Sequence, residues 1–395
     1  MFERKITWII LSVFSGLLAT VVNATTFNLP DDKTQVVGHN LIVYSHHEDT
    51  LLDIARNFDL GYSEIVDANP GVDVWLPGEQ QPVLVPNRFI LPDLGPDETR
   101  QGLVLNLAEM RLFFYPKVEK GQRAQVITHP LGIGREGWTT PLGKTRIIQK
   151  KKDPTWTVPA SILAEHEAKG DPLPRVVPAG PDNPLGAYAM RLAMPGYLIH
   201  GTNRPYGVGL RVSHGCLRMF PEDIEHLFGQ VALNSPVEII YEPNKATVEN
   251  GVLYIESHEI QQDMEPEDRD KTTPMVTAIF NAMGRHLTEQ EWPYVKHVLQ
   301  DHKGVVQKFN QPSIKPVEGV WFLHAGLTDN AQKVLLDTLL DMHLEEYFWP
   351  FRQAAVGEHL IGPFESKDIA DKIGAEISQE SGLSIWTVQV EDDAL

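Results

Sequence analysis

Cysteine is almost absent from this chain of 395 residues, because Cys216 is the only one. A single cysteine excludes an internal disulfide, so the folded units must be stabilised by packed hydrophobic cores. It also disfavours a cysteine-based zinc site, which needs three or four ligands. The composition, 42% hydrophobic, is sufficient for such cores. The length suggests two to four domains.

Basic residues are scarce as well. The chain has 34 Lys and Arg against 53 Asp and Glu, which gives a net charge of −19 at pH 7. An acidic surface repels the phosphate backbone, so nucleic acid is not an expected partner. After the first 24 residues no apolar run approaches the length of a membrane span.

The first 24 residues predict a signal peptide. Arg4 and Lys5 precede an apolar run at positions 6–21, and small residues at 22–24 form a cleavage site. The alternative is an uncleaved membrane anchor, for which the run is slightly short. We expect cleavage and export, with the protein acting outside the cytoplasm.

The segment from His200 to Arg218, with the sequence HGTNRPYGVGLRVSHGCLR, surrounds the single cysteine. It contains two histidines, His200 and His214, and several glycines that allow close backbone approach. Residues 183–221 contain no Asp or Glu. This basic island in an acidic chain carries four arginines: Arg191, Arg204, Arg211 and Arg218.

This pattern favours a reactive thiol. A free thiol ionises near pH ~8.5, and a neighbouring imidazole can take its proton and hold the thiolate as an ion pair. His200 ends a short apolar run that is typical of a strand, whereas His214 lies two residues before Cys216. The N–H groups of Gly215 and Cys216 are candidates for an oxyanion hole. The alternative is a small buried cysteine beside unrelated histidines.

The motif HxxN…SHGCLR resembles the signature of the L,D-transpeptidases, the YkuD-type catalytic domain of bacterial cell-wall enzymes. The resemblance implies that Cys216 is the nucleophile, that His200 donates and accepts the proton, and that the Gly201 carbonyl orients His200. His214 and Gly215 match the residues that shape the oxyanion site. Substrate contacts are implied for Arg218, and Asn203 and Ser213 also match the motif.

Strand alternation across residues 184–192 adds Tyr188 or Arg191 as side chains facing the cleft. The four arginines would attract the free carboxylates of peptidoglycan stem peptides. Neither a metal nor an organic cofactor is expected.

The reaction that the resemblance implies is acyl transfer through a thioester. Cys216 would attack a tetrapeptide stem between diaminopimelate and the terminal D-Ala, with His200 moving the proton. The acceptor would be a second stem, giving a 3–3 cross-link, or a protein such as a wall-anchored lipoprotein.

One alternative is a carboxypeptidase or amidase that uses water. Another is a non-catalytic protein that binds peptidoglycan glycan strands. With a signal peptide, the expected location is the periplasm.

The expected fold is multidomain, with a mainly β catalytic domain of the YkuD-like sandwich or barrel type at 98–242 and small α+β domains on either side. Strands are predicted at 103–107 and 111–115 as a hairpin, and at 125–129, 144–149, 184–192 and 237–241. A helix should begin at Pro221. The proline-rich segment 153–184 lacks periodicity and predicts a lid or binding loop, in which Trp156 offers an aromatic wall or a hydrophobic anchor. The glycine-rich loop 132–143 resembles the family loop that packs beneath the active site.

Residues 38–90 predict a strand, two helices and a strand, with Asp49-Thr50 capping the first helix. The order is similar to a LysM, the module that binds N-acetylglucosamine glycans, although Glu48 replaces its usual glycine. A spacer domain is the alternative reading.

Residues 243–314 predict a hairpin, two amphipathic helices and an acidic, solvated linker, similar to the tail after some transpeptidase domains. Residues 316–391 predict alternating strands and helices, similar to SPOR domains, which bind denuded glycan. The alternative there is a generic ferredoxin-like domain.

Overall fold

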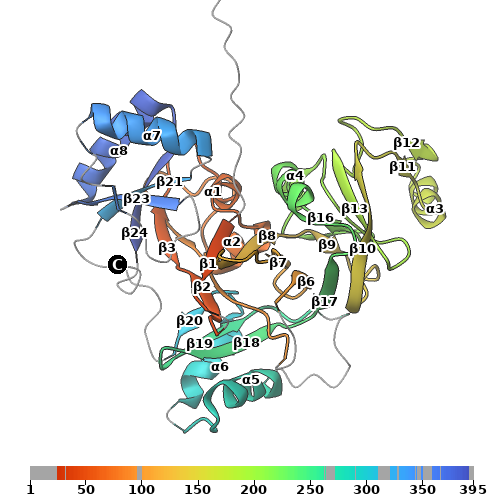
Figure 1. Ribbon diagram of the computed structural model, residues 1–395, viewed down its shortest axis with the longest axis horizontal. Helices are drawn as coiled ribbons and strands as arrows, with labels where there is room; N and C mark the ends of the chain where they lie inside the picture. The colour runs from red at the N-terminus through yellow and green to blue at the C-terminus, as the bar shows by residue number, and fades with distance from the viewer. Residues whose placement is uncertain are drawn as a thin grey trace, which may run out of the picture.

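The computed structural model accounts for most of the chain after the proposed signal peptide (Figure 1). It describes residues 25–31, 33–95, 100–261, 263, 272–289, 291–309, 321–326, 329–342, 344, 348–349, 358–364 and 366–390. The signal-peptide prediction lies outside these residues. Within the described ranges, no helix has both the length and the apolar character needed to cross a membrane.

A nine-stranded sheet forms the centre of the catalytic region. Its spatial order is β1 (Thr25–Leu29), β8 (Ala124–Pro130), β7 (Arg111–Tyr115), β6 (Gly102–Asn106), β17 (Pro236–Ile240), β10 (Gly143–Lys152), β13 (Tyr188–Leu192), β14 (Leu198–His200) and β16 (Leu217–Arg218). The predicted strands are all present, and the predicted hairpin is confirmed by the antiparallel pairing of β6 with β7. Helix α4 (Pro221–Gln230) begins at the predicted proline.

The N-terminal strand was not expected in this sheet. Strand β1 pairs antiparallel along β8, so residues 25–29 extend the sheet beyond the predicted limits 98–242. Alternation explains the placement, because Thr25, Phe27 and Leu29 are buried while Asn28 is exposed. The chain therefore enters the catalytic sheet before it builds the next unit.

The prediction that the segment 153–184 is a loop without regular structure was wrong. The segment contains β11 (Trp156–Thr157), α3 (Ala160–Ala168) and β12 (Val176–Val177), with β11 and β12 paired antiparallel. Helix α3 was not predicted, because Ile162 is its only buried side chain and the helix therefore has no apolar face in the sequence.

The predicted elements of residues 38–90 are all present, and we call them the βααβ unit. They are β3 (Leu41–Tyr44), α1 (Leu51–Asn57), α2 (Tyr62–Ala68) and β4 (Pro82–Val85), bracketed by the paired strands β2 (Val36–Gly38) and β5 (Arg88–Ile90). Helix α1 starts at Thr50, whose side chain accepts from the Asp53 N–H in a reciprocal capping box.

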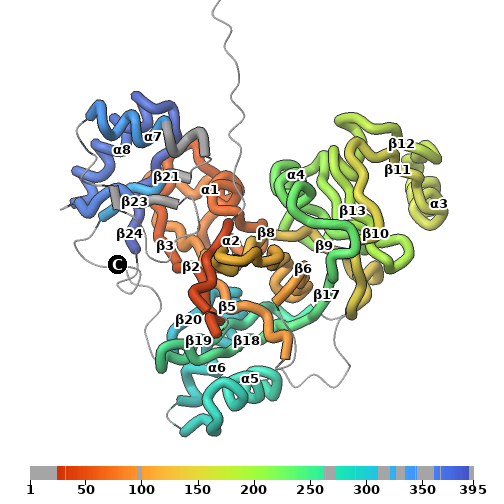
Figure 2. Tube along the Cα trace, viewed as in Figure 1, coloured from red at the N-terminus to blue at the C-terminus, as the bar shows by residue number. Residues whose placement is uncertain are grey.

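The last unit contains β21 (Trp321–Gly326), α7 (Asp329–Asp341), β22 (Phe348–Trp349), β23 (Glu358–Phe364), α8 (Lys367–Ser381) and β24 (Ile385–Val390), in the predicted order. Its sheet is shared, because β24 pairs antiparallel with β3 of the βααβ unit. A six-stranded sheet thus joins the two units, which lie side by side in Figures 1 and 2.

The region after the catalytic sheet contains β18 (Asn244–Glu249), β19 (Val252–Ser257), α5 (Thr273–Met283), α6 (Trp292–Asp301) and β20 (Gln307–Lys308). The hairpin and both helices were predicted. The acidic stretch is not wholly solvated, because Glu256 is buried and lies 3.0 Å from the ammonium of Lys245. Positions 264–271 of that stretch lie outside the described residues.

Candidate active site

Parallel pairing of β14 with β16 brings His200 and Cys216 to the same face of the sheet. Ile199 pairs with Leu217, and both side chains are fully buried in the core of the sheet. Because side chains alternate along a strand, the residues that flank them point to the opposite face. Leu198, His200, Cys216 and Arg218 accordingly all line one pocket.

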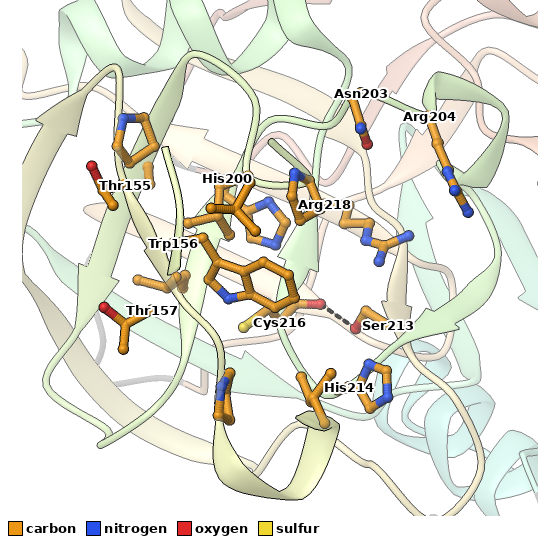
Figure 3. Close-up of a pocket in the computed structure, with 18 of the residues that line it drawn as sticks. Thr155, Trp156, Thr157, His200, Asn203, Arg204, Ser213, His214, Cys216 and Arg218 are labelled. Atoms are coloured by element: carbon orange, nitrogen blue, oxygen red, sulfur yellow. Dashed lines mark hydrogen bonds between the residues drawn. The ribbon is translucent and has the colours of Figure 1, made fainter. Parts of the chain in front are cut away.

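That pocket has a volume of about 1230 Å³. Its walls come from β13, β14, the segment 153–184 and the turn at η1 (Pro205–Gly207). Trp156 lines it, which fits the aromatic wall, one of the two roles expected for this residue, and Figure 3 shows the indole next to Cys216 in that view. The predicted site residues that line it are Arg191, His200, Asn203, Ser213, His214, Cys216 and Arg218.

His200 is held as a neutral base. Its side chain is buried, and Nδ1 lies 2.5 Å from the Gly201 carbonyl oxygen, the contact that the resemblance implies. A carbonyl only accepts, so Nδ1 carries the proton and Nε2 keeps its lone pair. Burial, and to a smaller extent the charge of Arg218, lower the pKa of His200 to about 4.

The Cys216 thiol is also neutral at rest. Burial raises its pKa, against smaller opposing effects from the Leu198 backbone and from Arg218. Its Sγ lies 3.7 Å from the Gly196 carbonyl oxygen. A raised thiol pKa beside a lowered imidazole pKa corrects the expectation of a resting ion pair.

Gly215 shapes the turn that carries Cys216, and its N–H is already hydrogen-bonded within that turn. Its N–H donates to Ser213 Oγ at 3.1 Å, Ser213 Oγ donates to the Cys216 carbonyl at 2.5 Å, and Thr140 Oγ1 donates to the Gly215 carbonyl at 2.8 Å. The expected Gly215 donor is therefore engaged. Glycine is required here because φ is +96° and a Cβ would lie 2.9 Å from the Tyr197 ring.

His214 borders the pocket and is fixed by a residue that the sequence did not reveal. Its Nε2 lies 3.0 Å from Glu165 Oε2 on α3, and Arg135 Nη2 donates to the same oxygen at 2.6 Å. Burial lowers the pKa of His214, while Glu165 opposes that effect. The segment 153–184 is thereby attached to residues 213–216, which carry the predicted nucleophile Cys216 and which we call the nucleophile loop.

The four arginines divide into two groups. Arg191, Arg204 and Arg218 line the pocket, whereas Arg211 pairs with Asp263 at 2.7 Å and lies outside it. Arg218 Nε is buried without a hydrogen-bond partner among the described residues, and burial lowers the pKa of Arg218. A desolvated guanidinium facing a pocket is suited to binding a carboxylate.

Tyr188 was expected as a side chain that faces the pocket, but it points away from it. Its hydroxyl donates to Glu225 Oε1 at 2.6 Å and its ring packs against Phe228, both on α4. Alternation separates it from Arg191, three positions along the same strand. Tyr188 therefore anchors the helix behind the nucleophile loop.

The glycine-rich loop 132–143 packs against the nucleophile loop. Strand β9 (Ile133–Gly134) pairs with β15 (Arg211–Ser213), and Gly132 exchanges two backbone hydrogen bonds with Arg218. A Cβ on Gly134 would lie 1.9 Å from the Trp138 carbonyl oxygen, so this close packing requires glycine. Two groups of His and carboxylate side chains in the described structure are close enough to share a metal ion, and both lie outside this pocket.

Comparison with known proteins agrees with this geometry. Residues 100–239 match the family model described as the L,D-transpeptidase catalytic domain, YkuD. The chain is 44% identical over 256 residues to "Probable L,D-transpeptidase YbiS" of Escherichia coli, which covers 62% of this chain and 81% of that one. It is 34% identical over 317 residues to "Probable L,D-transpeptidase YcfS" of the same organism, covering 78% and 96%. The chain belongs to the L,D-transpeptidase family.

Proposed function

We propose that this protein is a cysteine-dependent acyltransferase acting on peptidoglycan tetrapeptide stems. The observation that supports this most strongly is the shared face of Cys216 and His200, together with the Gly201 contact that leaves Nε2 of His200 as the proton acceptor. Cysteine and a neutral imidazole in one pocket are the components of nucleophilic acyl transfer.

The first step transfers the thiol proton to His200 Nε2 while sulfur attacks the amide between the L-centre of diaminopimelate and the terminal D-Ala. The C–S bond forms, the C–N bond breaks, and His200 returns the proton to the departing amine of D-Ala. An acceptor amine then attacks the thioester, loses its proton to His200 and releases the Cys216 thiol. The acceptor is a second stem or a wall-attached protein.

The arginines of the pocket explain why a stem peptide would bind. Its free carboxylates match Arg218, whose Nε has no hydrogen-bond partner among the residues that the structure describes, and Arg191 and Arg204 on the surrounding walls. A charge-assisted hydrogen bond from a partly buried donor such as Arg218 is among the stronger polar contacts, at roughly 1.5–3 kcal/mol. Asn203 and Trp156 complete the surface that the substrate would contact.

Export to the periplasm and glycan binding by the flanking units belong to the same proposal. The predicted signal peptide supports export, and the strand and helix order of the βααβ unit and of the C-terminal unit supports LysM-like and SPOR-like modules. Such modules would hold the enzyme near glycan strands.

The products of purified protein on tetrapeptide muropeptides, read by mass spectrometry, test the proposal. Dimers identify transpeptidation, whereas trimmed monomers identify the hydrolase that uses water at the same thiol. Cys216→Ala should abolish both. Unchanged muropeptides with the native protein, together with retained binding to peptidoglycan sacculi, would support a binding protein instead.

A further inference from the structure

A second cluster of reactive side chains lies between the βααβ unit and the catalytic sheet. Asp59 follows α1, His129 lies on β8, and Asp223 lies in the first turn of α4; these elements can be followed in Figure 1. All three side chains are at most 2% exposed. They are far apart in sequence and play no part in the proposed reaction.

The ligand atoms of this cluster converge without satisfying one another. His129 Nδ1 lies 3.4 Å from Asp59 Oδ2 and 3.7 Å from Asp223 Oδ2, and one ligand atom from each residue lies within 4.8 Å of the others. Within the described part of the chain, both ring nitrogens of His129, Oδ1 of Asp59 and Oδ2 of Asp223 are buried without a hydrogen-bond partner. Buried polar atoms in native proteins are almost always satisfied, so these require an explanation.

We propose that Asp59, His129 and Asp223 bind a divalent transition-metal ion of the zinc class. Zinc binds imidazole nitrogen and carboxylate oxygen at about 2.0–2.2 Å, so neighbouring ligands of a tetrahedral ion are roughly 3.4 Å apart. The distances from His129 Nδ1 to Asp59 Oδ2, 3.4 Å, and to Asp223 Oδ2, 3.7 Å, are close to that separation. A water or a second carboxylate oxygen supplies the fourth position.

The surroundings of the two carboxylates are those of metal ligands. The Thr25 N–H donates to Asp59 Oδ2 at 3.0 Å, and Arg56 Nη2 donates to Asp223 Oδ1 at 3.4 Å, so each carboxylate is oriented from outside. Outer hydrogen bonds of this kind fix ligand orientation.

The other His and carboxylate cluster provides a contrast within the same chain. Glu109, Glu256 and His258 also lie close together, but the Lys245 ammonium sits 2.8 Å from Glu109 and 3.0 Å from Glu256. A lysine cation already occupies that site. Arg56 pairs with the Asp59–Asp223 cluster at longer range, 3.4 Å from Asp223 Oδ1 and 4.0 Å from Asp59 Oδ1, so it does not sit between the carboxylates as closely as Lys245 does in the other cluster.

A metal ion here would fasten the βααβ unit to the catalytic sheet. Asp59 belongs to the unit, while His129 and Asp223 belong to the sheet and to the helix that follows the nucleophile loop. The role is structural, because none of the three residues lines the Cys216 pocket.

Zinc binding by the full-length, tag-free protein tests this inference independently of catalysis. A Cys216→Ser background removes the chain's one thiol, a strong zinc ligand that could bind the ion elsewhere. After removal of metal with EDTA and titration with zinc chloride, we expect about one zinc ion per chain by elemental analysis and a higher melting temperature. Cobalt chloride should give the visible bands of a low-coordinate nitrogen and oxygen site. Absence of stoichiometric metal in both titrations would overturn the proposal.

Matched variants locate the ion. His129→Gln and Asp223→Asn should each weaken zinc binding by at least about tenfold, as loss of a metal-site partner does. His258→Gln, in the lysine-filled cluster, should bind zinc like the parent. Retained binding in the first two variants, or its loss in the third, would place the ion elsewhere and refute the assignment. If either of the first two variants fails to fold, the zinc stoichiometry and the cobalt spectrum of the parent protein decide whether the chain binds a metal ion through nitrogen and oxygen ligands.

Discussion

His200 and Arg218 are direct partners in the parallel pairing of β14 with β16, and both face the pocket that contains Cys216. The guanidinium charge lowers the pKa of His200 and counteracts the raised pKa of the thiol. In the proposed reaction, this arginine would add to the effect of burial in keeping His200 neutral, would favour the developing thiolate and would bind a substrate carboxylate.

The pH dependence of activity should follow this arrangement. His200 acts as a base only when neutral, and its pKa is about 4 instead of the ordinary 6.5, so kcat/KM should persist at pH 5 and fall only as pH approaches 4. The rate of Cys216 alkylation by iodoacetamide should rise with pH and reach half its maximum above the ordinary thiol value, because burial raises the pKa. An acid limb near pH 6.5 would contradict the account.

Removing the guanidinium should change binding and pH dependence together. Arg218→Gln should raise KM by about 10- to 100-fold, the equivalent of ~1.5–3 kcal/mol for a lost charged hydrogen bond. It should also move the acid limb upward from pH 4, since the positive charge no longer opposes protonation of His200. Arg211→Gln is the matched control, because Arg211 pairs with Asp263 outside the pocket and its loss should leave KM nearly unchanged.

The nucleophile turn should not tolerate a side chain at Gly215. Gly215→Ala places a Cβ 2.9 Å from the Tyr197 ring at a φ of +96°, which should cost about 1–3 kcal/mol of stability and displace the thiol. Gly229→Ala on α4 meets nothing within 4 Å and should stabilise the helix by about 0.5–1 kcal/mol. Thermal unfolding and activity of both variants measure the difference. Full activity of Gly215→Ala would show that the turn adapts.

The attachment of the segment 153–184 should depend on Glu165. Glu165→Gln removes the charge that holds Arg135 and His214, so limited proteolysis within the segment should become faster and kcat/KM should decrease. Glu167→Gln, exposed on the same helix, should behave like the native protein. Equal cleavage rates in the two variants would show that other contacts hold the segment.

Sequence patterns were sufficient where local chemistry determines the outcome. Alternating strands, the Thr50 cap and Pro221 at the start of α4 depend on neighbouring residues, and each appears as predicted. The grouping of His200, Cys216 and Arg218 in one pocket also followed from the motif.

Contacts between distant segments were beyond these patterns. Nothing local indicates that Glu165 reaches His214, that Asp263 pairs with Arg211, or that β24 pairs with β3. Tyr188 was misplaced because its strand could be read with either face toward the pocket. The Gly215 N–H was assigned to the oxyanion site because a hydrogen bond to Ser213 cannot be seen without the fold.

The mass of the intact protein during turnover of a tetrapeptide donor tests the central claim most directly. The account predicts a covalent adduct equal to the donor without its terminal D-Ala, released by hydroxylamine, located on Cys216 by peptide mapping and absent from Cys216→Ser. Product formation by Cys216→Ser, or an adduct on another residue, would contradict it.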